Sequence, residues 1–190
     1  MTRKAMSTRD LCLLALFVAI VAVLAQIVIP LPFVPLTMQT FAVALAGVVL
    51  GARKGSIAVL IYVLLGALGA PVFSAFQGGL GMLAGTHGGY ILSFPLLAFV
   101  AGLAADKARG FWQRDQKTLA AIILAGGLFL GMLLNLSAGS LQLMFVLDLS
   151  LPAALSAGML PFLLPEFLKA VLVFTIASKL RQFVSRGTDS

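Results

Sequence analysis

The chain contains little charge: only 10% of its 190 residues are Asp, Glu, Lys or Arg, whereas soluble domains carry about 25%. In their place, 61% of the residues are hydrophobic, and the mean hydropathy is +1.12. This composition excludes an ordinary soluble domain and indicates an integral membrane protein. A span needs about 20 residues, so residues 1–190 suit a single membrane domain of about six short spans.

Cysteine and histidine are also scarce, with one residue of each. Cys12 has no second cysteine as a partner, which excludes an intramolecular disulfide. His87 has neither cysteine nor carboxylate neighbours and is a poor metal site, so we expect no metal and no cofactor. A Ser-His-Asp arrangement, paired catalytic carboxylates and a nucleotide-binding loop are missing as well. The sequence therefore predicts a non-catalytic protein that cannot hydrolyse ATP itself.

Hydrophobic segments of helical length follow one another along the chain, and they predict an all-α fold. Proline, glycine or charged residues separate the segments at 30–36, 51–55, 71–89, 106–117 and 137–160. We expect 51–55 to form a tight basic turn and the outer separators to be irregular. The expected membrane spans are about 11–29, 37–50, 56–70, 90–105, 118–136 and 161–180.

The positions of the basic residues predict which ends of the spans face the cytoplasm. Apart from Lys169, they lie before residue 11, at 53–54, at 107–117 and after residue 178. The alternate connections contain no Lys or Arg. Six spans with both termini in the cytoplasm therefore satisfy the positive-inside rule at every loop. The net charge of +7 is explained by the lipid bilayer, without nucleic acid as a partner.

The connections expected on the outer side are long, apolar and rich in Gly and Pro, unlike the short basic loops on the inner side. Irregular backbone at membrane depth is tolerated where it is buried in protein or lines a cavity. We therefore expect a ligand pocket and its lid in the outer half of the molecule.

Lys169 lies inside a hydrophobic segment, and Glu166 precedes it by three residues. An ionisable group at membrane depth costs about 2.5–3.5 kcal/mol on insertion scales, which makes this pair a candidate ligand site. Pro165 suits the first helical position, which puts Glu166 in the first turn and Lys169 on the same face, beside free N–H groups that attract anions. The alternative is that Lys169 snorkels to the outer interface while Glu166 caps the helix.

The Gly-rich stretch ends in a second candidate region, Thr86-His87-Gly88-Gly89-Tyr90. Glycines let the backbone approach a ligand closely, but a turn followed by an interfacial tyrosine explains the same residues. Isolated amides within the spans, Gln39, Gln26 and Asn135, form a third group. The favoured interpretation of each amide is a hydrogen bond between helices.

Small residues recur in the first expected span. Ala15 and Ala19 are four residues apart, so they share one face of a helix. Such a stripe permits close packing against a neighbouring span or another subunit, and the spacing does not decide between these two.

Four blocks of the sequence occur in an order typical of one family. They are Pro35-Leu36-Thr37-Met38-Gln39-Thr40-Phe41-Ala42-Val43 with Leu45-Ala46-Gly47, then residues 62–73, then Gly85-Thr86-His87-Gly88-Gly89-Tyr90, and last Leu160-Pro161-Phe162 with Glu166-Phe167-Leu168-Lys169-Ala170. Across about residues 11–180, they resemble BioY, the family of biotin-binding S components of energy-coupling factor (ECF) transporters.

The resemblance implies an S-component fold of six helices and high-affinity capture of biotin from outside. It also implies delivery through a complex with a transmembrane T component and two ATPase subunits, in the plasma membrane of a bacterium or archaeon. Biotin contacts are implied for Glu166 and Lys169, for the loop Thr86-His87-Gly88-Gly89-Tyr90, and for Gln39. Ala15 and Ala19 match the first-helix motif through which S components contact the T component.

Two positions depart from the family pattern, and two other functions stay open. The family commonly has Asp where Glu166 stands, and Pro-Thr where Thr86-His87 stands. One alternative function is an S component for another small vitamin. The other is a self-sufficient secondary transporter or channel, although a proton-driven permease is expected to carry more intramembrane ionisable groups. The sequence also leaves open which end of biotin Lys169 and Glu166 each contact.

Overall fold

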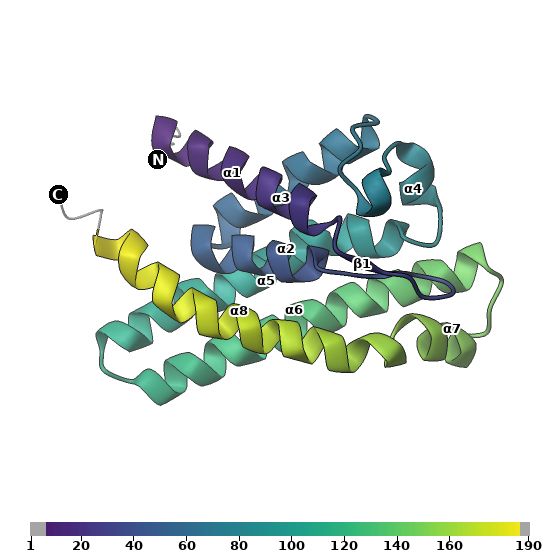
Figure 1. Cartoon of the computed structure of the whole chain (residues 1–190). Helices are drawn as coiled ribbons and strands as arrows, with labels where there is room; N and C mark the ends of the chain where they lie inside the picture. The colour runs from purple at the N-terminus through teal and green to yellow at the C-terminus, as the bar shows by residue number, and fades with distance from the viewer. Residues whose placement is uncertain (1–6, 187–190) are drawn as a thin grey trace, which may run out of the picture.

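The computed structural model describes residues 7–186, with side chains described as far as Ala177. The elements in chain order are α1 (Thr8–Leu24), β1 (Val28–Ile29), β2 (Leu36–Thr37), α2 (Gln39–Leu50), α3 (Ala52–Ala67), the 3-10 turn η1 (Ser74–Phe76), α4 (Leu80–Ala84), α5 (Gly88–Gln113), α6 (Lys117–Val146), α7 (Leu151–Gly158) and α8 (Leu160–Arg186) (Figure 1). The predicted all-α fold is confirmed, with one small addition. The strands β1 and β2 pair antiparallel into a short hairpin.

Three helices in the described part of the chain are long and apolar enough to cross a membrane, namely α5, α6 and α8 as far as Ala177. With 26 and 30 residues, α5 and α6 are about 39 and 45 Å long, against a hydrocarbon core of about 30 Å. The chain is therefore an integral membrane protein. Six complete spans and cytoplasmic termini stay a prediction. The predicted orientation depends partly on basic residues outside the described part of the chain, namely Arg3, Lys4 and the side chains of Lys179, Arg181 and Arg186.

The short helix α2 lies at the centre of the molecule, with α1 and α3 on one side and α8 on the other (Figure 1). Ten of its 12 residues are buried, and it packs on α1, α3, α5 and α8. Its crossing with α5 is close, because a Cβ on Gly47 would lie 2.2 Å from the carbonyl oxygen of Ala98. Because α2 is short and surrounded by other helices, its first residues, Gln39 and Thr40, lie inside the protein.

Within the first expected span, 11–29, helix α1 stops at Leu24 and the hairpin follows. Three prolines, at positions 30, 32 and 35, remove N–H groups from the stretch that follows, which favours a turn over a continued helix. Gln26 secures this region: its side-chain amide donates to the carbonyl of Phe73 at 3.1 Å and accepts from the N–H of Phe76 at 2.8 Å. The hairpin and the connection after α3 are thereby held next to each other.

The connection expected at 137–160 is largely helical instead. Helix α6 continues to Val146, and α7 follows after a four-residue turn at 147–150. Gly139 explains why α6 can continue alongside α5, because a Cβ there would lie 2.1 Å from the ring of Tyr90. Small residues thus favour close helix packing here, where the sequence was consistent with an irregular loop.

The tight basic turn expected at 51–55 is reduced to Gly51, and α3 begins at Ala52. Gly51 adopts a positive φ of 85°, which glycine tolerates. The carboxylate of Asp106 in α5 accepts a hydrogen bond from the N–H of Ala52 at 2.9 Å. This satisfies one of the free N–H groups at the start of α3 and explains why the helix begins so early.

Candidate functional site

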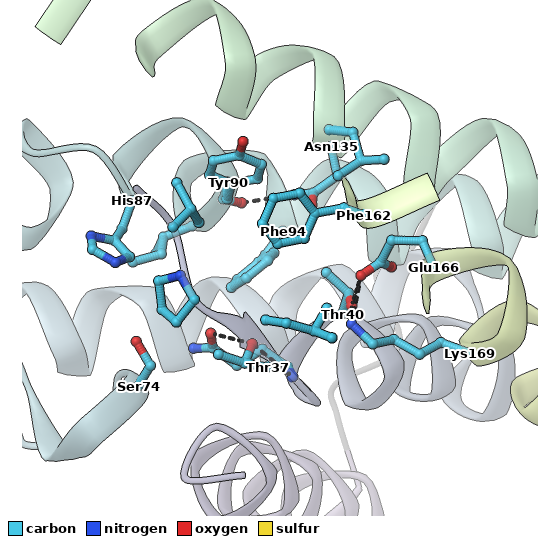
Figure 2. Close-up of a pocket in the computed structure, with 16 residues that line it drawn as sticks. Thr37, Thr40, Ser74, His87, Tyr90, Phe94, Asn135, Phe162, Glu166 and Lys169 are labelled. Carbon is cyan, nitrogen blue, oxygen red and sulfur yellow. Dashed lines mark hydrogen bonds and ion pairs between the residues drawn. The ribbon is translucent and has the colours of Figure 1, made fainter. Parts of the chain in front are cut away.

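A cavity lies between the hairpin and the helices α2, α5, α6 and α8, and Figure 2 draws the 16 residues that line it. Apolar and aromatic side chains form much of the wall, with polar groups between them, as is typical of small-molecule sites. The cavity measures about 40 Å³, which is room for a few water molecules. A molecule the size of a vitamin is larger than this enclosed space.

One side of the cavity is a buried ion pair between Lys169 and Glu166 of α8, joined by Thr40 of α2 (Figure 2). Lys169 Nζ donates to Glu166 Oε1 at 2.5 Å and to Thr40 Oγ1 at 2.9 Å. The Thr40 hydroxyl donates to Glu166 Oε1 at 2.8 Å. Both charged side chains are only 6% exposed, so Lys169 turns into the protein and does not snorkel to the interface.

The expected position of this pair at a helix N-terminus is wrong. Helix α8 begins at Leu160, and Pro165 lies inside it. Pro161 is the proline near the start of the helix. Glu166 is therefore six residues, or about 9 Å, along α8, beyond the first turn where the helix dipole acts. The attraction of this site for an anion or a carbonyl oxygen comes from the ammonium of Lys169, not from free N–H groups.

Gln39 lines the cavity and also joins three elements. Its side-chain nitrogen donates to the hydroxyl of Tyr62 in α3 at 2.7 Å, and its Oε1 accepts from Thr37 Oγ1 in β2 at 3.0 Å. The Tyr62 hydroxyl in turn donates to the carbonyl oxygen of Val72 at 2.9 Å. The interhelical hydrogen bond expected for Gln39 is present, and the same bonds hold the hairpin over the cavity.

The loop before α5 divides its residues between the cavity and helix packing. His87 and Tyr90 line the cavity, whereas Thr86, Gly88 and Gly89 are not among the lining residues. The two glycines allow close packing, since an added Cβ would lie 1.8 Å from an α4 carbonyl at Gly88 and 2.4 Å from an α6 carbonyl at Gly89. Helix packing thus accounts for both glycines, and their contacts with biotin stay predictions. Burial lowers the pKa of His87, which favours its neutral form at neutral pH.

Tyr90 contributes its ring to the cavity wall and its hydroxyl to a structural contact. The hydroxyl donates to the carbonyl oxygen of Gly158 at 2.6 Å, which attaches α5 to the corner between α7 and α8. Its ring lies 6.3 Å from that of Phe162, at an angle of 45°. Phe94 and Phe162 also line the cavity (Figure 2). These aromatic rings form an apolar face opposite the polar residues of α2.

Several cavity residues escape prediction from the sequence. Thr40 follows Gln39 in an apolar segment, and two consecutive polar residues there were the available signal. Phe94 and Phe162 carry no signal, because a phenylalanine in an apolar span is as consistent with lipid contact as with a binding site. Asn135, expected to bond between helices, does so and also borders the cavity.

The alanine stripe lies on the outside of the molecule. Helix α1 packs inward through Leu14, Phe17 and Val21, whereas Ala15 and Ala19 are exposed. The stripe is therefore not used for packing between the described helices. Its contact with another subunit stays a prediction.

Comparisons with known proteins agree on one family. A sequence model of the BioY family matches residues 1–186. The chain is 39% identical over 176 residues to the probable biotin transporter BioY of Pyrococcus horikoshii, covering 93% of this chain and 98% of that protein. It is 41% identical over 175 residues to the biotin transporter BioY of Thermotoga maritima, covering 92% and 96%.

The fold is also similar to a solved structure. A crystal structure of the S component for biotin from an ECF-type ABC transporter superposes with a TM-score of 0.81 at 26% sequence identity. The match covers 94% of this chain and 95% of the other. The chain therefore belongs to the BioY family.

Proposed function

We propose that this member of the BioY family is the biotin-binding S component of an ECF-type uptake transporter and captures biotin from outside the cell. The observation that carries the proposal is the buried cluster of Lys169, Glu166 and Thr40 beside a cavity with aromatic walls. The family relationship supplies the identity of the ligand. The S component is a non-catalytic binding subunit, and ATP hydrolysis belongs to its partners.

Biotin has three chemical parts that suit this cavity: a polar ureido ring, a thioether ring and an aliphatic valerate with a carboxylate. We assign Lys169 to an oxygen of the ligand and Glu166 to ligand N–H groups. Before binding, the two residues neutralise each other, which lowers the cost of keeping each charge buried. Tyr90, His87 and Gln39 would border the ligand, and the loop at 86–89 would lie near it.

The small enclosed volume of the cavity favours a wall that moves when the ligand enters, and the hairpin is the best candidate. Two residue pairs join β1 to β2, with one further hydrogen bond from the N–H of Met38 to the carbonyl oxygen of Ile27, whereas most of the other walls are helices packed on one another. We therefore propose that residues 28–37 move outward to admit biotin and close over it. The lid that the sequence predicts in the outer half of the molecule is then the hairpin.

The transport partners follow from the same assignment. We propose six spans with both termini in the cytoplasm, in the plasma membrane of a bacterium or archaeon. A T component would contact the exposed Ala15 and Ala19 of α1, where small side chains permit close helix approach. Two ATPase subunits would supply the energy for release of biotin inside.

The proposal is tested by identifying the small molecule that co-purifies with the protein, by mass spectrometry, followed by calorimetric titration with biotin. Biotin bound at about one molecule per chain is the expected result. A different vitamin in its place would make the chain an S component of other specificity. Saturable uptake by the chain alone, in vesicles lacking any ATPase, would instead indicate a self-sufficient transporter.

A further inference from the structure

Asn135 of α6 is a buried amide that holds α5 and α6 together with one half of its side chain. Only 1% of the surface of Asn135 is exposed. The Nδ2 group donates to the carbonyl oxygen of Tyr90 at 2.8 Å and to the hydroxyl oxygen of Ser93 at 2.7 Å. Both donors of the amide are therefore in use within the protein.

The other half of the amide is unpaired. The carbonyl oxygen of Tyr90 can only accept, so the amide nitrogen of Asn135 has to face it, and this determines where Oδ1 points. No donor in the described part of the chain reaches Oδ1, although the atom is buried. A buried acceptor without a partner is rare in proteins and costly, so it calls for an explanation. Asn135 lines the cavity, which supplies one.

A second unpaired acceptor belongs to the same cavity. Glu166 Oε1 receives both Lys169 and Thr40, while Oε2 is buried and has no partner among the described residues. Lys169 carries three N–H donors, and Glu166 and Thr40 account for two of them. Two residues that line the cavity, on α6 and α8, thus each carry an unpaired acceptor, and Lys169 has one unused donor. Figure 2 shows Asn135 and Glu166 on neighbouring helices beside Phe162.

We infer that Asn135 Oδ1 is a third polar contact for the ligand and accepts a hydrogen bond from a ring N–H. A cyclic urea has two N–H donors on either side of one carbonyl acceptor, which is the complement of the groups that the cavity leaves free. Asn135 and Glu166 each accept from one N–H, and Lys169 donates to the carbonyl oxygen. The inference rests on the proposed function and adds a residue that selects for an intact urea.

The test uses two analogues of biotin, each a cyclic carbamate in which one of the two ureido N–H groups is replaced by oxygen. The replacing oxygen has no hydrogen to donate and presents a lone pair to the acceptor Asn135 Oδ1 or Glu166 Oε2. Calorimetric titration of the purified, ligand-free protein measures the affinity for biotin and for both carbamates. We expect the wild-type protein to bind each carbamate about 10- to 100-fold more weakly than biotin.

Asn135→Ala identifies which carbamate reports on this residue. The variant should bind biotin about 10- to 100-fold more weakly, and its discrimination against one of the two carbamates should fall below about threefold. Ser140→Ala is the matched control, since Ser140 is also a buried polar residue of α6 but does not line the cavity. This control should keep the discrimination of the wild-type protein.

Several results would overturn the inference. If the Asn135→Ala variant discriminates against both carbamates as strongly as the wild-type protein, Asn135 only packs α5 against α6. If Asn135→Ala does not fold, the wild-type protein decides, because rejection of only one carbamate, or of neither, contradicts two separate acceptors. Failure of the wild-type protein to bind biotin at all would count against the proposed function and is thereby distinct from these outcomes.

Discussion

Two lysine–carboxylate pairs of this protein, one within α8 and one between α1 and α3, differ in their surroundings more than in their geometry. Lys169 and Glu166 are 2.5 Å apart with side chains 6% exposed. Lys54 of α3 and Asp10 of α1 are 2.6 Å apart, with side chains 44% and 21% exposed. The N–O distances are nearly the same, so the two pairs differ mainly in how much water surrounds them.

The difference supports the proposal that Lys169 and Glu166 contact the ligand, and that Lys54 and Asp10 do not. Lys54 and Asp10 join α1 to α3 where solvent screens their attraction, and Asp10 also belongs to a capping box with Ser7 at the start of α1. Lys169 and Glu166 had to lose their hydration on folding, and an apolar pair would often serve stability equally well. A charged pair retained in the core of a membrane protein is better explained by binding.

The largest effect is expected from Lys169→Ala. This substitution leaves the carboxylate of Glu166 buried without its cation, which typically costs about 3–5 kcal/mol. Biotin affinity should fall more than about 100-fold, since the variant loses the contact of Lys169 with the ligand and also leaves Glu166 without its ion-pair partner. Thermal unfolding and calorimetric titration measure the two effects. Wild-type affinity in this variant would exclude the assigned role of Lys169.

The double variant Lys169→Met with Glu166→Leu separates stability from binding. It replaces both charges by apolar side chains of similar size, which is often neutral or stabilising for a buried pair. We expect a melting temperature at or above that of the wild-type protein, together with loss of biotin binding. A stable double variant that still binds biotin would show that the pair has a structural role alone.

Glu166→Asp should have an intermediate effect. The charge is kept, but the side chain is one methylene shorter and cannot keep contact with both Thr40 and Lys169 in the present geometry. Since the family commonly has Asp here, we expect binding to persist with affinity reduced by about 3- to 10-fold, equivalent to one weakened hydrogen bond. Complete loss of binding would mean that neighbouring residues are adapted to the longer acid.

The smallest effect is expected from Lys54→Ala, the exposed counterpart of Lys169→Ala. Biotin affinity should not change, because Lys54 does not line the cavity. The hydrogen bond from Lys54 holds the pKa of Asp10 below its ordinary value of 3.8. The stabilisation by this pair is therefore present above pH 3.8 and lost as the pH falls through the lower pKa of folded Asp10. Melting temperatures of both proteins at neutral and acidic pH should converge in acid.

The buried ion pair could be found from the sequence, whereas its setting could not. Lys169 and Glu166 stand out because charge is rare in apolar segments, and the spacing of three puts them on one helix face. Proline at 165 suggested a helix start, but proline is also tolerated inside membrane helices, and the structure has α8 begin at Leu160. Thr40 completes the cluster from 126 residues away, which no local pattern reveals.

The sequence by itself determined the membrane environment, the helical class, the family and the identity of the central ion pair. These follow from composition and from residues that are close along the chain. The tertiary structure alone decided that the hairpin covers the cavity, that Gly88 and Gly89 serve helix packing, and that Asn135 and Glu166 leave acceptors free in one cavity. The physical reason is that the partner of a buried donor or acceptor comes from a distant segment of the chain. Only folding determines whether that partner is present.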